Sequence, residues 1–169
     1  MSIIQYADIV YDTIVDGLGL RNTLYVSGCS HNCPGCHNKA LQDYNYGKRD
    51  NIDNIVNKLI IDNNDITLSG GEPFEQCRQL IELLGNIDLR DKYNNNPKRN
   101  IWIYSGYTFE HLILNPNQLN LLSMCDVLVD GKFDINKKDL NLKFRGSSNQ
   151  RIIDVKKSLK ENKVIELEL

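Results

Sequence analysis

Three cysteines fall within eight residues, and this stretch constrains the fold more than any other part of the chain. They are Cys29, Cys33 and Cys36. Thiolates at this spacing can hold three corners of a cubic iron-sulfur cluster, whereas the usual four-thiolate arrangement needs a further cysteine that the loop lacks. One iron would then be left open for a substrate or cofactor, as at a catalytic metal site.

The same spacing is also compatible with other kinds of site. The three cysteines could hold zinc together with His31 or His37, or two of them could form a disulfide. Cys77 could be a fourth cluster ligand, but it lies on an apolar helical stripe that is typical of a buried core thiol. We expect both Cys77 and Cys125 to be buried. Five cysteines without an export signal favour free thiols with a metal or catalytic role.

Strand and helix patterns alternate along the chain, which predicts an α/β fold with a mostly parallel sheet. Strands are expected over residues 3–15, 22–27, 65–69, 100–104, 126–129 and 163–169. Helices are expected after a cap at Asp50 or Asn51, from Pro73 to an exit at Gly85, and over 109–122 with a break at Pro116. Residues 91–99 are expected to form a polar loop.

The length of the chain limits how far such a sheet can close. The 169 residues suit one domain over 1–169. A closed barrel of eight strand-helix units usually needs about 250 residues. We therefore expect a partial, open (β/α) barrel, with its exposed side free to meet a large partner.

Four polar or glycine-rich motifs each follow a predicted strand. They are the cysteine loop, Gly70-Gly71-Glu72-Pro73, Ser105-Gly106-Tyr107 and Asp130-Gly131-Lys132. Active sites of parallel sheets lie where the strands end at their carboxyl termini. The four motifs should therefore converge on one rim, which a zinc clip alone would not require.

With the Gly-Gly-Glu-Pro turn beside the cysteine motif, the chain resembles the radical S-adenosylmethionine (SAM) enzymes. More closely, it is similar to the family of activating enzymes of anaerobic ribonucleoside-triphosphate reductase. The closer match is carried by residues 16–21, 33–38, 104–107, 129–133 and 144–151, which span nearly the full length. The run Phe-Arg-Gly-Ser-Ser-Asn-Gln-Arg at 144–151 narrows the resemblance most.

The resemblance implies an oxidoreductase with a [4Fe-4S] cluster on Cys29, Cys33 and Cys36, whose open iron binds SAM. An external one-electron donor would drive reductive cleavage of SAM to a 5'-deoxyadenosyl radical. That radical would take a hydrogen from a glycine of the large reductase subunit and leave a glycyl radical there. The protein would bind, orient and exclude water while the cofactors carry the chemistry.

The resemblance also implies a SAM site. Gly70 and Gly71 would let the backbone approach the methionine part, and Glu72 would act with the cysteines by accepting a hydrogen bond from the amino group. Further residues expected near the cofactor are Gly35, His37, Ser105, Tyr107, Asp130 and Lys132. Asp130 and Lys132 could instead form a surface ion pair, and Ser105 and Tyr107 could be plain loop residues. The three arginines that could contact the SAM carboxylate or the partner's glycine loop are Arg21, Arg145 and Arg151.

Composition narrows location and partners. A net charge of −2 gives no broad footprint for nucleic acid. No stretch approaches about 18 consecutive apolar residues, and the N-terminus lacks the layout of a signal peptide. We therefore expect a cytoplasmic protein with no nucleic-acid or membrane partner. Two other functions stay open: a small radical SAM enzyme acting on a free small molecule, and a zinc or iron-sulfur binding module.

Overall fold

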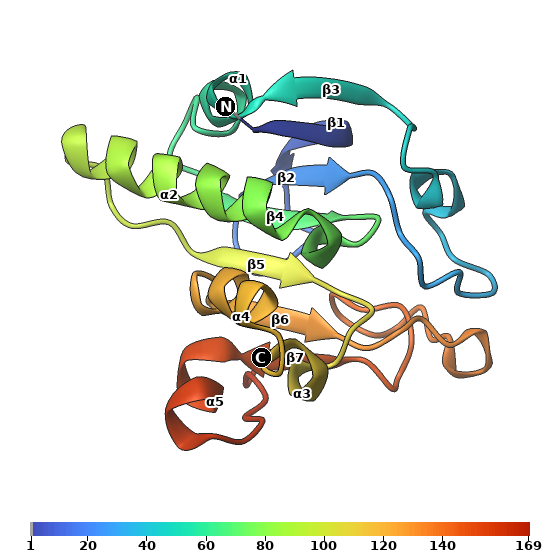
Figure 1. The fold of residues 1–169 in the computed structure, drawn as a ribbon. Coiled ribbons are helices and arrows are strands. Elements are labelled where there is room, and N and C mark those ends of the chain that lie inside the picture. The colour runs from blue at the N-terminus through green and yellow to red at the C-terminus, as the bar shows by residue number, and fades with distance from the viewer. Residues whose placement is uncertain (1) are drawn as a thin grey trace.

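A computed structural model describes residues 2–169 of the chain, and its centre is one open sheet (Figure 1). The strands are β1 Ile3–Thr13, β2 Arg21–Val26, β3 Lys48–Asn51, β4 Asp65–Gly70, β5 Ile101–Tyr104, β6 Val127–Asp130 and β7 Arg151–Asp154. The helices are α1 Ile52–Leu59, α2 Cys77–Tyr93, α3 Phe109–Leu112, α4 Pro116–Ser123 and α5 Val155–Glu161. Short 3-10 turns occupy Lys39–Gln42, Pro73–Gln76 and Ile135–Lys137. Among these residues, no helix combines the length and apolarity that crossing a membrane requires.

The strand order is β3-β1-β2-β4-β5-β6-β7. Strands β2, β4, β5 and β6 run parallel, while β1, β3 and β7 pair antiparallel at the two sides. The sheet stays open because β3 and β7 are its edges. This confirms the predicted α/β fold with a partial, open barrel, and it brings the carboxyl ends of four parallel strands to one rim.

The two faces of the sheet are covered differently. Successive side chains of a strand point to opposite faces, so Leu68 and Ile103 join the main core beneath the helices, while Thr67 and Trp102 point to the other face. The helices cover the first of these faces in Figure 1. The other face is covered by loops, and Trp102 forms a smaller apolar cluster there with Phe144 and neighbouring residues.

Helix α1 confirms its predicted start. The Asn51 side chain accepts a hydrogen bond from the Asn54 N–H at 2.9 Å, which satisfies one of the free amides at the helix terminus. The residues that α1 buries are Ile52, Ile55, Val56 and Leu59. The predicted break at Pro116 is also confirmed, since α4 begins there with Asn115 as its cap.

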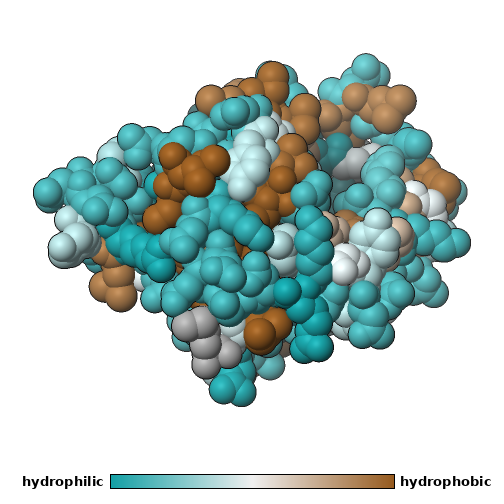
Figure 2. Space-filling model, turned by 90° about the horizontal axis from the view of Figure 1, so that it is seen from above, coloured by the Kyte–Doolittle hydropathy of each residue, from teal (hydrophilic) through white to brown (hydrophobic). Residues whose placement is uncertain are grey.

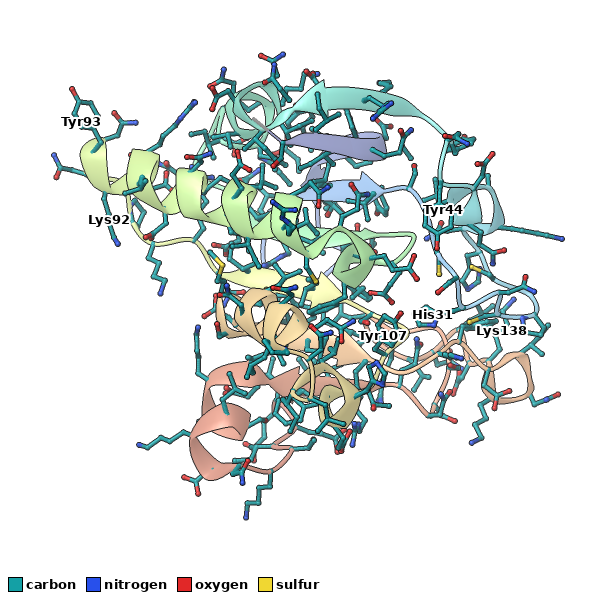
Figure 3. The ribbon with its side chains drawn as sticks, viewed as in Figure 1. His31, Tyr44, Lys92, Tyr93, Tyr107 and Lys138 are labelled. Carbon is teal, nitrogen blue, oxygen red and sulfur yellow. The ribbon has the colours of Figure 1, made fainter. Side chains whose placement is uncertain are left out.

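Helix α2 does not end at Gly85, as predicted, but continues to Tyr93. The local exit signal is overridden because the next turns also pack: Ile87 is buried in the core, and Asp91 is buried in an ion pair with Arg99 at 2.8 Å. The predicted loop over 91–99 therefore begins only after the helix. The apolar Tyr93 side chain lies at the exposed far end of α2 (Figure 3).

The predicted final strand over 163–169 is wrong. That segment makes one isolated bridge, from Glu166 to Ile153, and the regular element before it is helix α5. The α5 helix begins where the Asp154 side chain accepts a hydrogen bond from the Lys157 N–H at 3.0 Å. The alternating pattern in the tail fits its contact with the sheet edge but does not produce a full ladder.

The surface is mixed rather than uniformly polar. Seen from above in Figure 2, it is largely hydrophilic, with apolar side chains in separate groups. One set of exposed apolar residues lies in the loop that joins β1 to β2, namely Ile14, Val15, Leu18 and Leu20.

Candidate active site

A cavity of about 490 Å³ lies at the rim where the parallel strands end. Its wall includes residues from all four predicted motifs: Cys29, Cys33, Cys36, Gly70, Gly71, Ser105, Gly106 and Gly131. The volume is within the range of sites that bind small molecules, about 300–1,000 Å³. The structure therefore brings the four motifs together around one space.

Backbone contacts hold the cysteine loop against the turn that follows β4. Gly28 donates its N–H to the Leu41 carbonyl at 2.7 Å, and its own carbonyl accepts from the Glu72 N–H at 2.8 Å. Gly71 must be glycine because a Cβ there would lie 2.5 Å from the Gly28 oxygen. The close approach that we assigned to the methionine of SAM is thus also needed for contact between two loops of the protein itself.

The three loop thiols are partly buried, and none of the five cysteines forms a disulfide. Burial raises the pKa of Cys29 to about 11, and burial also raises the pKa of Cys33. A buried thiol becomes a thiolate readily only next to positive charge, which a metal centre supplies. The chemistry of this donor set therefore fits a metal cluster.

Within residues 2–169, no three His, Cys, Asp or Glu side chains meet as ligands of one metal ion. The Nε2 atom of His31 lies 2.7 Å from the Glu72 carboxylate, so this nitrogen is not directed at the loop thiols. The three loop cysteines line the same cavity, which agrees with ligands of one cluster.

Cys77 and Cys125 are buried, as predicted. Cys77 is the first residue of α2 and lies in the core, where it donates its S–H to the Phe74 carbonyl, while Cys125 is fully buried before β6. Neither lines the cavity. Cys77 is therefore a packing residue, which removes the alternative of a fourth cluster ligand.

Glu72 is buried behind the cavity wall rather than in it. Its carboxylate accepts hydrogen bonds from the Phe74 N–H at 3.0 Å, the Gly106 N–H at 2.8 Å and the Ser105 hydroxyl at 3.0 Å. The Nε2 atom of His31 lies 2.7 Å from the same carboxylate. The structure thus connects Glu72 to the cysteine loop and to the loop after β5, and leaves Gly70 and Gly71 as the cavity-facing part of the turn.

Tyr107 also lies behind the wall. Its ring meets the His31 ring edge-on at 4.5 Å and stacks on His111 at 4.7 Å. His31 and Tyr107 lie near one another at the rim in Figure 3. Ser105 does line the cavity, although its hydroxyl is engaged with Glu72.

Asp130 and Lys132 do not line the cavity. The Asp130 carboxylate is buried, accepts from the Phe109 N–H at 2.8 Å and pairs with Arg151 at 2.6 Å. The sequence left open a surface ion pair of Asp130 and Lys132, whereas the structure shows a buried Asp130 that pairs with Arg151. Lys132 lies close enough to Cys33 to lower the pKa of that thiol, against the larger effect of burial.

The three arginines are placed in different surroundings. Arg21 is fully buried at the opposite end of β2, where its Nε donates to Thr67 at 2.7 Å. Arg151 is held by Asp130 and Glu110. Arg145 alone of the three lines the cavity, and its buried Nε has no hydrogen-bond partner. The tertiary structure therefore selects Arg145 as the guanidinium that can meet an anionic group in the cavity.

Of Gly35 and His37, only His37 faces the cavity. His37 lines the cavity, with its ring 5.2 Å from the ring of Phe133. Gly35 faces away, since a Cβ there would lie 2.5 Å from the Ile135 side chain. Its positive φ of 72° also favours glycine. The predicted residues that reach the cavity are therefore His37, Ser105, Arg145, the two glycines after β4 and the three cysteines.

Sequence reasoning missed a group of cavity residues on the strands themselves. These are Tyr25, Ser69 and Tyr104, joined by Asp16 from the loop between β1 and β2. Each of the three strand residues is on the face opposite the helices, at a polar position of its strand. The alternation of polar and apolar residues in β2 and β4 was the signal that could have identified them.

Comparisons with known proteins agree with this site. The model of a family described as a 4Fe-4S single cluster domain matches residues 15–153. The chain is 39% identical over 145 residues to the anaerobic ribonucleoside-triphosphate reductase-activating protein of Escherichia coli K12, covering 81% of this chain and 90% of that relative. It is 38% identical over 159 residues to the activating protein of Pasteurella multocida, covering 90% and 96%. The corresponding protein of Enterobacteria phage T4 is 33% identical over 145 residues, covering 82% and 86%.

Proposed function

Because the chain belongs to the family of anaerobic ribonucleoside-triphosphate reductase-activating proteins, we propose that it activates such a reductase as a radical SAM enzyme with a [4Fe-4S] cluster. The observation that carries this proposal is the meeting of three free thiols and a double-glycine turn in one cavity at the strand ends. A metal module without chemistry of its own would not need a ligand-sized space beside its thiols.

Cys29, Cys33 and Cys36, which line the cavity, would hold the cluster. When bound, the cluster and SAM supply the one-electron chemistry that yields a 5'-deoxyadenosyl radical. The protein contributes orientation and a shielded space, since the strands and loops of the rim surround the cavity. Two backbone segments, Gly70-Gly71 and Ser105-Gly106, would orient the methionine part through their carbonyl oxygens, because the N–H groups of Gly71, Ser105 and Gly106 already donate within the protein.

The remaining contacts with the cofactor would come from side chains of the cavity wall. The Nη1 of Arg145 donates to the Gln150 carbonyl at 2.7 Å, and its remaining N–H groups would pair with the carboxylate of SAM through charge-assisted hydrogen bonds. His37 and Ser105 would contact the cofactor from opposite loops. The cavity wall itself would be held in place by the residues behind it, which are Gly35, Glu72, Tyr107, Asp130 and Lys132.

The reductase is the partner that this function requires, and its large subunit would present the glycine that becomes the radical. The cavity mouth suits a protein surface, because Ile14 and Val15 are each 69% exposed and Val15 also lines the cavity. SAM cleavage consumes one electron, so an external one-electron donor is also needed. Free thiols are typical of a reducing compartment, which supports a cytoplasmic location.

The test is anaerobic reconstitution with iron and sulfide, followed by incubation with SAM, a strong reductant and the reductase. We expect bound iron and sulfide, release of 5'-deoxyadenosine, and a glycyl radical on the large subunit by electron paramagnetic resonance. A cluster that forms but cleaves no SAM would reject the proposal. Turnover of a free small molecule without the reductase would favour the other kind of radical SAM enzyme, and a colourless protein with bound zinc would favour a binding module.

A further inference from the structure

The Glu72 carboxylate has no acceptor site left for a ligand. An ionised carboxylate offers about four lone-pair sites, and four donors occupy them: Phe74 N–H, Ser105 O–H, Gly106 N–H and the His31 ring. The residue is only 1% exposed. Glu72 therefore joins three loops of the rim, and its carboxylate is not available to the amino group of SAM.

His31 is fixed on several sides at the rim. Its side chain is 5% exposed, and because an ionised carboxylate can only accept, its Nε2–H donates to Glu72 at 2.7 Å. Tyr107 packs edge-on against the ring at 4.5 Å. Gly106 leaves room for the ring, since a Cβ there would lie 2.5 Å from the His31 Cδ2 atom. The His31 ring is thus placed as specifically as a core residue, although it belongs to a loop (Figure 3).

The same residue is also close to a cluster ligand along the chain. His31 follows Cys29 by two residues, and both line the cavity, so the fixed place of the His31 ring also restrains the backbone beside the Cys29 sulfur. Hydrogen bonds to the sulfurs of an iron-sulfur cluster help to set its reduction potential. A side chain that restrains this backbone therefore influences the cluster without touching it.

We propose that His31 and Glu72 are positioning residues for the cluster. The hydrogen bond between them sets the cysteine loop at a fixed place relative to the loops after β4 and β5, and so sets the Cys29 environment and the alignment of cluster and SAM. The inference rests on the proposed function, because it requires the loop thiolates to hold a cluster. It gives Glu72 a role that differs from contact with the methionine amino group.

The test compares variants in the reconstituted protein. His31→Leu removes the donor, and His31→Gln keeps an N–H donor on a side chain of similar reach. The control is His111→Leu, which removes the exposed histidine stacked on Tyr107 but leaves the bond to Glu72 intact. Iron and sulfide content shows first that each variant carries its cluster.

For His31→Leu we expect a midpoint potential shifted to more negative values, because the backbone beside Cys29 is no longer restrained and its N–H groups hydrogen-bond less well to the cluster sulfurs. The change that SAM causes in the resonance spectrum of the reduced cluster should weaken. The kcat for SAM cleavage should fall by about tenfold or more, as for loss of a hydrogen bond to a charged group, while KM for SAM changes less. His31→Gln should restore most of the potential and the rate, and His111→Leu should match the wild type.

The variant Glu72→Gln tests the second residue of the pair. If the two residues act as one unit, the double variant His31→Leu with Glu72→Gln should be no worse than the more severe single variant. An unchanged potential and spectrum in His31→Leu would overturn the inference, as would an equal shift in His111→Leu. A loss of SAM binding in Glu72→Gln that His31→Leu does not share would show instead that Glu72 contacts SAM. If His31→Leu cannot hold a cluster, His31→Gln decides by the same measurements.

The potential and the spectrum need no reductase, so they separate this inference from the proposed function. If the wild-type protein carries its cluster but cleaves no SAM, the proposed function is rejected. The midpoint potentials of the variants would still test the roles of His31 and Glu72. A wild-type protein without any cluster would overturn both.

Discussion

The two faces of the sheet differ in what covers them and in what they hold. Beneath the helices lies a continuous apolar core, in which Leu24, Leu68 and Ile103 are fully buried. The opposite face carries a small cluster around Trp102, a buried Arg21 and the polar strand residues of the cavity. One face of the same strands is thus used for stability and the other for chemistry.

The difference shows how an open barrel can hold a reactive site. Apolar burial beneath the helices contributes roughly 25 cal/mol per Å² of area removed from water, so that face needs few specific contacts. The loop-covered face has a smaller apolar cluster, and its order depends also on particular hydrogen bonds and close approaches such as those of Gly17 and Arg21. Substitutions on the loop face should therefore have more specific effects than those under the helices.

The two groups of cysteines give the largest contrast. Cys33→Ala should abolish bound iron and all SAM cleavage, because a corner of the cluster loses its ligand. Cys125→Ala, beneath the helices, should keep both and cost about 1 kcal/mol of stability from packing alone. Iron analysis and 5'-deoxyadenosine release measure the first effect, and urea unfolding measures the second. Equal loss of iron in both variants would mean that the ligands are misassigned.

Gly17→Ala tests the close packing of the loop face. Gly17 has φ of +136°, and a Cβ there would lie 2.8 Å from the Trp102 ring and 2.9 Å from the Arg21 side chain. We expect a loss of about 1–3 kcal/mol in the free energy of unfolding, since overpacking adds to backbone strain. The control is Gly19→Ala, whose Cβ would have no neighbour within 4 Å. If both variants lose the same stability, strain alone accounts for the effect.

Arg145→Met tests whether the loop face binds the carboxylate of SAM. Hydrogen bonds to charged groups contribute about 1.5–3 kcal/mol, so affinity for SAM should fall roughly tenfold or more. Equilibrium binding of SAM to the cluster-loaded protein gives this number. Lys143→Met removes an exposed charge from the same loop and should leave the affinity unchanged. A similar loss in both variants would point to general charge rather than to contact with Arg145.

Gly85→Ala gives the smallest effect and one of opposite sign. Gly85 lies inside α2, and a Cβ there would meet nothing within 4 Å. Alanine should therefore stabilise the protein by about 0.5–1 kcal/mol, because glycine loses more backbone freedom in a helix. Thermal or urea unfolding would detect the gain. Destabilisation would contradict a helix that continues through this position.

Local patterns predicted most elements of the fold. The cap at Asn51 and the break at Pro116 depend on neighbours a few residues away, so the sequence alone indicates them. The continuation of α2 past Gly85 could not be predicted in this way. It depends on burial of Ile87 and on the ion pair of Asp91 with Arg99, which join segments that only tertiary packing brings together.

The sequence by itself determined the cysteine motif, the alternation of strands and helices, and hence the rim where the four motifs meet. Only the tertiary structure decided that Arg145 lines the cavity, that Arg21 and Arg151 do not, and that Glu72 faces His31. The reason is physical. Backbone preferences act between near neighbours, whereas the direction of a loop side chain depends on which distant groups can satisfy its charge and hydrogen bonds.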